Sequence, residues 1–266
     1  PIAIEESLTA RTKAIVPVHL FGQCADMETI MRIAEANGLY VIEDNAQAIG
    51  ADYTFSNGLT KKAGTIGTVG TTSFFPSKNL GCYGDGGALF VQDEDLAQCI
   101  GMIANHGQKV KYYHDVVGIN SRLDTLQAAV LRVKLKELDT YCQKRNRTAS
   151  FYDEQLLGLS AISCPQRVEN STHVFHQYTI KCNTFDREEL RQFLAGKGIP
   201  SMVYYPVPLH LQKAYLSYGF NEGDCPVSEK LSSQVLSLPI HTEQQEDELR
   251  YISTAIKTFL ASKHLI

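Results

Sequence analysis

The chain has 266 residues, of which 44% are hydrophobic and 20% are charged, and its formal net charge is −4. This composition is typical of a globular protein with one or two domains, and its weakly acidic balance excludes a basic surface for nucleic acid or an anionic membrane. No apolar run is long enough to span a bilayer, and the seven scattered cysteines, which form no CxxC pair, favour reduced thiols in a cytoplasmic protein and give no sign of a metal site.

The first half of the sequence alternates between apolar runs and amphipathic segments. Asp26 is a suitable N-cap for a helix over 27–37, which Gly38 would end. A second helix is predicted over 93–105, where an acidic first turn suits the helix dipole. The apolar runs predict strands at 14–21, 39–44, 68–75 and 87–93. Strands and helices in this rhythm predict a mostly parallel α/β sheet.

The second half follows a different pattern. A helical pattern over 121–156 has few breakers and is predicted to link two domains. After it come a strand at 173–182, a capped helix at 186–199, an extended proline-bearing segment at 201–210 and a terminal amphipathic helix at 243–263. The sequence therefore predicts a large α/β domain over residues 1–156 and a smaller α+β domain over residues 157–266.

Two polar features follow predicted strands of the large domain. Asp44 ends the strand at 39–44, and Lys78 follows the strand at 68–75 within "SFFPSKNLGCYGDGG". Ligands of open parallel sheets collect at the carboxyl ends of the strands, so both side chains are expected to reach one crevice. A carboxylate and an amine in one pocket suit pyridoxal phosphate, because the lysine bonds to the cofactor and the acid pairs with its ring nitrogen. Ser73 could supply a hydroxyl to the phosphate, and the glycines after Lys78 would let the backbone pass close to the cofactor.

Each of these features also has an ordinary explanation. A lysine beside a glycine-rich loop is usually a solvated surface group, an aspartate at a strand end is usually a turn or cap residue, and "GDGG" is usually a turn. The loop is not a Walker A motif, because the chain contains no GxxxxGK[ST] sequence. His106 and His114 lack the spacing of a metal site on a helix and are interpreted as structural or surface residues.

A family resemblance adds to this argument. It rests on six stretches that occur in order almost from end to end: "IEDNAQAIGA" (42–51), "SFFPSKNLGCYGDGGAL" (73–89), "NHG" (105–107), "GINSRLDTLQAAVL" (118–131), "YYPVPLHLQKAY" (204–215) and "VLSLPIH" (235–241). In these stretches the chain resembles the DegT/DnrJ/EryC1/StrS nucleotide-sugar aminotransferases, which have the fold type I architecture of aspartate aminotransferase. The resemblance implies a pyridoxal-phosphate enzyme with a large, mostly parallel domain and a smaller α+β domain.

The resemblance also implies roles for individual residues. Lys78 resembles the lysine that bonds to the cofactor and then shuttles a proton, and Asp44 resembles the partner of the ring nitrogen. Gln47 stands where the family places a side chain beside the ring hydroxyl, and Ser73 resembles the serine that binds the phosphate. Asn120 resembles an asparagine that reaches the cofactor phosphate of the neighbouring subunit, which implies a homodimer with shared active sites.

Three further residues match positions near the family's substrate entrance, and for each of them helix packing or a surface contact is a competing interpretation. They are Arg122, Tyr205 and His210. The implied reaction moves an amino group from glutamate to a keto group of a nucleotide-linked sugar destined for a surface polysaccharide or glycoconjugate. The stretches "GINSRLDTLQAAVL" (118–131) and "PVPLHLQ" (206–212) are most similar to members that aminate the 3-position of a UDP-linked 2-acetamido uronic acid. In that case Arg122 would face the carboxylate of the uronic acid.

The resemblance leaves alternatives open. The family has a further N-terminal segment that holds the cofactor phosphate and stacks on its ring, and the resemblance implies that this chain starts after that segment and is a fragment of a longer enzyme. One alternative is therefore a truncated, non-catalytic homologue that acts as a dimerisation or binding module. Another is a pyridoxal-phosphate-dependent sugar dehydratase, although relatives with that activity replace the lysine by histidine, and Lys78 favours transamination.

Overall fold

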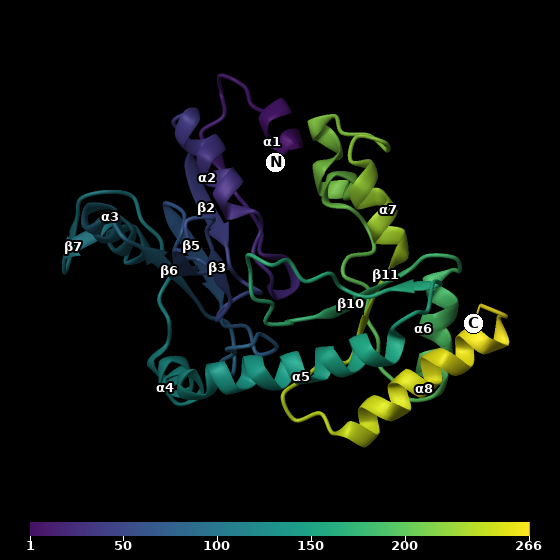
Figure 1. Ribbon diagram of the computed structural model, residues 1–266. Coiled ribbons are helices and arrows are strands. Elements are labelled where there is room, and N and C mark those ends of the chain that lie inside the picture. The colour runs from purple at the N-terminus through teal and green to yellow at the C-terminus, as the bar shows by residue number, and fades with distance from the viewer. Residues whose placement is uncertain (266) are drawn as a thin grey trace. The chain divides into compact units, whose positions relative to one another are not determined.

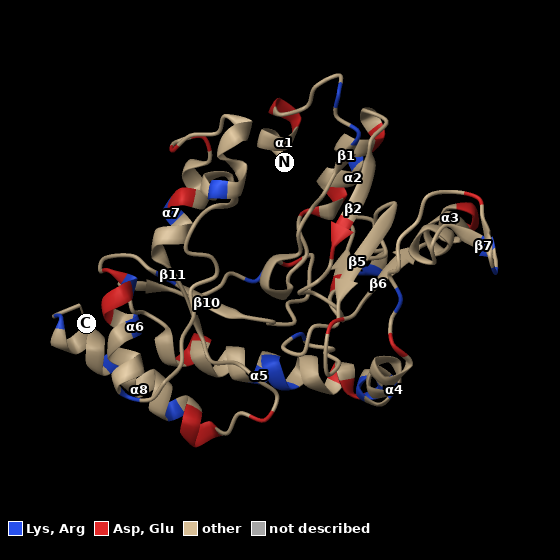
Figure 2. Ribbon diagram, turned by 180° about the vertical axis from the view of Figure 1, so that it is seen from behind, with Lys and Arg blue, Asp and Glu red and all other residues tan. Residues whose placement is uncertain are grey.

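The structure is a computed structural model that describes residues 1–265. The chain divides into two compact units: the first contains Pro1–Gln143 and Arg167–His176, and the second contains Lys144–Gln166 and Gln177–Ile266 (Figure 1). The sequence placed one boundary after residue 156, whereas the compact units divide within helix α5 (Leu138–Leu156). Figure 2 shows acidic and basic residues mixed along the helices and loops of both units.

The first unit is built on a four-stranded sheet. Its strands are β1 (Ala14–Ile15), β2 (Tyr40–Asp44), β5 (Val69–Ser73) and β6 (Gly87–Val91), in the order β1-β2-β5-β6. The strands β1, β2 and β5 are parallel, and β6 runs antiparallel to β5. The predicted parallel-rich α/β sheet is confirmed.

The predicted strand at 14–21 is mostly wrong, because only its first two residues pair along β2. Pro17 has no backbone N–H to donate and cannot continue a ladder on that side. Val18 forms only an isolated bridge with Asp44, and a 3-10 turn follows at Leu20–Gly22. The chain therefore leaves the sheet just where it passes the end of β2.

The two helices predicted in this unit are confirmed as α2 (Met27–Ala36) and α3 (Glu94–Ala104). Asp26 caps α2 by accepting a hydrogen bond from the backbone N–H of Thr29 at 3.3 Å. The sequence did not predict α1 (Ile2–Glu6) or the two hairpins formed by β3 (Asp52–Thr54) with β4 (Thr60–Lys62) and by β7 (Gln108–Val110) with β8 (Tyr113–His114). These strands have two or three residues each, too few for a periodic pattern.

The predicted helix at 121–156 is three consecutive elements. They are α4 (Thr125–Lys134), a 3-10 turn at Leu135–Glu137 and α5. Asp124 has an extended backbone conformation and precedes the first helical residue, so residues 121–124 are not helical.

Residues 167–176 pack with the first unit although they follow α5 in the chain. The N–H of Cys24 donates to Ser171 Oγ at 3.0 Å, and the N–H of Val174 donates to the carbonyl of Gly22 at 2.8 Å. Asn79 Nδ2 donates to the carbonyl of Val174 at 2.9 Å. The sequence predicted a strand across 173–182, but residues 173–176 belong to the first unit and only residues 178–182 form a strand.

The second unit has an antiparallel sheet of β9 (Ile162–Ser163), β10 (Tyr178–Cys182) and β11 (Val235–Leu238), in the order β11-β10-β9. Its helices include α6 (Arg187–Gly196), α7 (Pro226–Gln234) and α8 (Glu246–Ser262). The predictions for α6 and α8 are confirmed, and α7 was not predicted. Within residues 1–265, no helix has the length and apolar character needed to cross a membrane.

Candidate functional site

Asp44 and Lys78 are positioned by two adjacent parallel strands of the first unit. Asp44 is the last residue of β2 and lies opposite Thr71 of β5 in the register. Lys78 follows β5 in a turn that is closed by a hydrogen bond from its own N–H to the carbonyl of Phe75 at 2.9 Å. The two side chains therefore come from the same edge of the sheet, as the sequence predicts.

The two charges act on one another. Lys78 is half-buried, and this burial lowers its pKa below the usual value, while the negative charge of Asp44 partly opposes the shift. A lysine whose pKa is lowered is more often present as the free amine. In that form its Nζ can act as a nucleophile or accept a proton.

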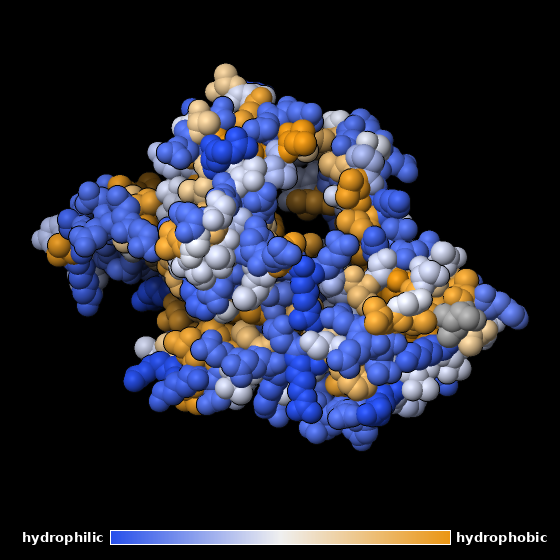
Figure 3. Space-filling view, in the orientation of Figure 1, coloured by the Kyte–Doolittle hydropathy of each residue, from blue (hydrophilic) through white to orange (hydrophobic). Residues whose placement is uncertain are grey.

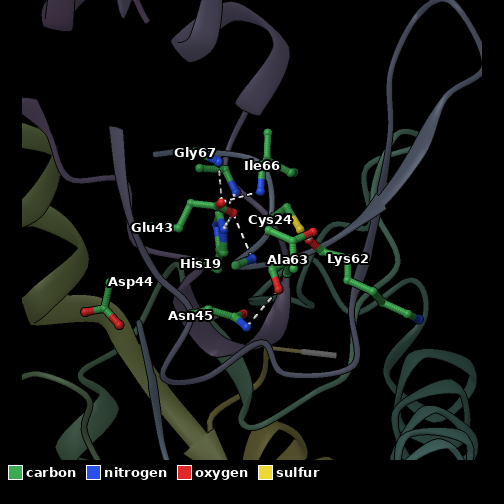
Figure 4. Close-up of polar contacts among 12 residues, drawn as sticks. His19, Cys24, Glu43, Asp44, Asn45, Lys62, Ala63, Ile66 and Gly67 are labelled. Carbon is green, nitrogen blue, oxygen red and sulfur yellow. Dashed lines mark hydrogen bonds and ion pairs between the residues drawn. The ribbon is translucent and has the colours of Figure 1, made fainter. Parts of the chain in front are cut away.

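The backbone of Asp44 is held on both sides. Its N–H donates to the carbonyl of Pro17 at 2.9 Å, and its carbonyl accepts from the N–H of His19 at 3.0 Å. Asp44 Oδ1 accepts from the N–H of Ala46 at 3.0 Å. In Figure 4 the Asp44 side chain points away from the polar cluster around Glu43.

Gln47 and Ser73 lie near these strand ends. Gln47 Oε1 accepts from the N–H of Phe21 at 2.6 Å, which fixes the orientation of its amide. Ser73 ends β5, and its Oγ accepts from the N–H of Phe75 at 3.2 Å. A hydroxyl that accepts a hydrogen bond can still donate its own proton, so Ser73 keeps a donor for an anionic group.

The glycines around Lys78 contact the chain's own backbone. A Cβ on Gly81 would lie 2.5 Å from the carbonyl oxygen of Pro76, and one on Gly87 would lie 2.7 Å from that of Thr72. Both distances are below any real Cβ contact, so only glycine fits at these positions. The sequence interpretation placed these glycines against a cofactor, whereas they let the loop pack against β5 and the lysine turn.

Asn120 and Arg122 lie in the segment between β8 and α4. Both are exposed, and Arg122 Nε donates to Asn120 Oδ1 at 3.0 Å. They line a cavity of about 710 Å³ together with residues of β5, β6 and the 85–87 loop. Among the described residues, its lining includes neither Asp44 nor Lys78.

Tyr205 and His210 belong to the second unit. The side chain of Tyr205 is exposed. The side chain of His210 is only 10% exposed, and its Nε2 lies 2.9 Å from Glu229 Oε1. Glu229 also accepts from the N–H groups of Gly223 and Cys225, so His210 is part of a local network of that unit.

Sequence reasoning missed His19 and Glu43, which are fully buried beside Asp44. Their signal was present, since each is a polar residue inside an apolar run, "VPVHLF" and "LYVIED". A buried ionisable residue needs partners, and the sequence does not indicate which residues those are.

The chemistry of these donors fits pyridoxal phosphate: an acid for the ring nitrogen, a half-buried amine for the carbonyl carbon and a serine hydroxyl for the phosphate. The fold and these groups define a pyridoxal-phosphate-dependent aminotransferase of fold type I. The chain belongs to the DegT/DnrJ/EryC1/StrS aminotransferase family, whose model matches residues 1–257.

Several known proteins are similar to the chain. It is 48% identical to a pleiotropic regulatory protein of Geobacillus stearothermophilus, over 97% of the chain and 68% of the relative. It is 45% identical to the UDP-N-acetyl-3-dehydro-alpha-D-glucosamine 3-aminotransferase of Acidithiobacillus ferrooxidans, over 97% of the chain and 67% of the relative. The crystal structure of DesV from S. venezuelae, in complex with a ketimine intermediate, superposes with a TM-score of 0.92 at 40% identity, over 97% of this chain and 68% of that one. The chain therefore spans about two thirds of the length of these proteins.

Proposed function

We propose that the protein moves an amino group from glutamate to the keto group at position 3 of a UDP-linked 2-acetamido sugar, for a surface polysaccharide or glycoconjugate. The observation that carries this proposal is the half-buried Lys78, whose lowered pKa is opposed by the charge of Asp44 at the end of the neighbouring strand. The similarity to a 3-aminotransferase for a UDP-linked sugar supports the substrate class.

Bound pyridoxal phosphate supplies an electron sink for the carbon atom that loses its proton. Asp44 would hold a proton at the ring nitrogen, which would keep the ring able to accept electrons. Lys78 would hold the cofactor at its carbonyl carbon, and as a free amine its Nζ would take a proton from the substrate carbon and return it. Ser73 would donate its hydroxyl to a phosphate oxygen, and Gln47 would hold the ring hydroxyl.

The test follows the amino group in the full-length protein. The protein is supplied with pyridoxal phosphate, glutamate and a UDP-linked 3-keto sugar, and the products are identified by mass spectrometry. We expect an amino sugar and 2-oxoglutarate, and a loss of about 10³-fold in turnover for Lys78→Ala, since general acid–base catalysis contributes this much. Loss of a hydroxyl without a gained amine would identify a dehydratase. Cofactor binding without turnover of any such sugar would favour a non-catalytic module.

We further propose that the protein is a homodimer in which Asn120 reaches the partner's cofactor phosphate. Apolar side chains near Asn120 are strongly exposed, including Val117 (96%), Tyr112 (77%) and Leu126 (72%). Figure 3 places hydrophobic residues on the surface over α4, which begins five residues after Asn120. Exposed apolar surface of this extent is typical of a protein interface.

We propose that Arg122 binds a carboxylate of the sugar, as in a uronic acid. The guanidinium has five N–H donors, and Asn120 Oδ1 accepts from Nε, which leaves the planar NH₂ edge for a carboxylate. Tyr205 and His210 are assigned to the substrate entrance on the family resemblance. We also propose a cytoplasmic location, since no disulfide joins any of the cysteines within residues 1–265.

A further inference from the structure

We propose that His19 and Glu43 form a buried positioning pair that fixes the orientation of Asp44 and thereby sets how tightly the protein holds its cofactor. The inference rests on the proposed function, because it assigns to the pair an effect on the residue that faces the cofactor ring. Neither residue touches the cofactor in this proposal, so both act through Asp44.

The pair is completely enclosed. Both side chains are 0% exposed, and His19 Nε2 lies 2.8 Å from Glu43 Oε2. The same oxygen accepts from the N–H of Gly64 at 2.8 Å, and Glu43 Oε1 accepts from the N–H groups of Ile66 and Gly67 at 2.6 Å each (Figure 4). Four donors therefore surround one carboxylate.

The hydrogen bonds also fix the charge of each partner. The N–H of Ala25 donates to His19 Nδ1 at 3.2 Å, so Nδ1 carries a lone pair and Nε2 carries the proton that it donates to Glu43. Burial alone would raise the pKa of Glu43, but the hydrogen bonds from His19 and the three backbone N–H groups outweigh this effect. The pKa of Glu43 is therefore lowered, and the carboxylate is ionised. The pair is thus a neutral imidazole that is bonded to an anion.

The pair is linked to Asp44 from two sides. Glu43 precedes Asp44 in β2, and successive side chains of a strand point to opposite faces, so fixing Glu43 on one face fixes the direction of Asp44 on the other. His19 also donates its backbone N–H to the carbonyl of Asp44 at 3.0 Å. A single residue therefore holds Glu43 through its ring and Asp44 through its backbone.

Stability alone does not require a charge at this position. A buried ion or ion pair costs desolvation, and apolar replacements of similar volume are often equally stable. A carboxylate with four directional hydrogen bonds fixes the rotation of β2 about its own axis at the last residue, which an apolar side chain does not. That rotation sets the direction of the Asp44 side chain.

The test measures the dissociation constant of pyridoxal phosphate by absorbance titration of the full-length protein. Glu43→Gln replaces one carboxylate oxygen by an NH₂ group, which must face two of the four donors, so the strand end shifts. Ile33→Val is the matched control, because it removes one methylene from the buried face of α2 without touching the pair. We expect Glu43→Gln to weaken binding about ten-fold, and Ile33→Val to stay within about two-fold of the wild type.

The decisive comparison repeats Glu43→Gln in an Asp44→Ala background. If the pair acts through Asp44, its effect on cofactor affinity falls to less than about two-fold there, because coupled residues are not additive. An equal effect in both backgrounds, or equal effects of Glu43→Gln and Ile33→Val, would overturn the inference. If Asp44→Ala alone leaves affinity unchanged, the assignment of Asp44 in the proposed function fails instead.

A second pair of variants leaves Glu43 and its three backbone donors in place. His19→Phe removes the ring donor, and His19→Gln keeps an N–H that can reach the carboxylate. We expect His19→Phe to weaken cofactor binding about ten-fold and His19→Gln to restore most of it. Equal affinities for the two variants would also overturn the inference, even where Glu43→Gln does not fold.

Discussion

Glu43 and Asp44 are neighbours in β2, yet their carboxylates have opposite surroundings. Glu43 is fully buried and accepts four hydrogen bonds, whereas the side chain of Asp44 points away from that cluster and its charge acts on Lys78. The alternation of a single strand separates a structural anion from one that is available for chemistry.

Replacing Lys78 by methionine is expected to remove turnover and change the pH dependence of stability. Burial lowers the pKa of Lys78, so between its folded and unfolded pKa values the unfolded chain binds more protons than the folded chain. The free energy of unfolding should therefore rise with pH across that interval in the wild type, and Lys78→Met should lack this rise. Urea unfolding of both proteins without cofactor, at several pH values, checks this. A wild-type stability that falls relative to Lys78→Met in the interval would refute the burial argument.

Gly70→Ala is expected to destabilise the protein strongly. A Cβ at Gly70, the second residue of β5, would lie 1.9 Å from the carbonyl oxygen of Gly64, which is backbone and cannot move aside cheaply. We expect a loss of at least about 3 kcal/mol in the free energy of unfolding. Gly101→Ala in α3 is the matched control, because its Cβ meets nothing within 4 Å, and alanine should add about 0.5–1 kcal/mol there. Similar effects in the two variants would contradict this packing.

Mixing two inactive variants tests the shared active site. In a mixed dimer of Lys78→Ala and Asn120→Ala subunits, one of the two sites has an intact Lys78 and receives an intact Asn120 from the partner. Activity should therefore reappear after subunit exchange, although each variant alone is inactive or nearly so. If Asn120 serves its own subunit, mixing restores nothing. A monomer in analytical ultracentrifugation would refute the homodimer directly.

Arg122→Gln is expected to reduce selectivity for a substrate with a carboxylate. A hydrogen-bonded carboxylate is worth roughly 1.5–3 kcal/mol, so KM for a UDP-linked 3-keto uronic acid should rise about 10- to 100-fold. The corresponding neutral sugar, which has a hydroxymethyl group instead, should be affected little. Arg132→Gln on exposed α4 is the control for loss of a positive charge. Equal changes in KM for both sugars would show that Arg122 does not bind the carboxylate.

The main features of the site could be predicted from the sequence because each depends on a pattern of neighbouring residues. Asp44 and Lys78 each follow an apolar run, and parallel strands bring their ends to one edge. The His19–Glu43 pair could not be predicted, since it joins residues 24 positions apart and is completed by backbone donors from a third segment. The place of residues 167–176 could not be predicted for the same reason, because their partners lie far back in the chain.

The position of residues 167–176 affects how the protein folds during its synthesis. Cys24 and Gly22 find their hydrogen-bond partners in Ser171 and Val174, and Asn79 is anchored to Val174 as well. When the strands of the first unit have left the ribosome, residues 167–176, which supply these hydrogen-bond partners, have not yet been released. The unit that carries the lysine therefore completes its fold only after residue 176 has emerged, when much of the second unit is still being synthesised.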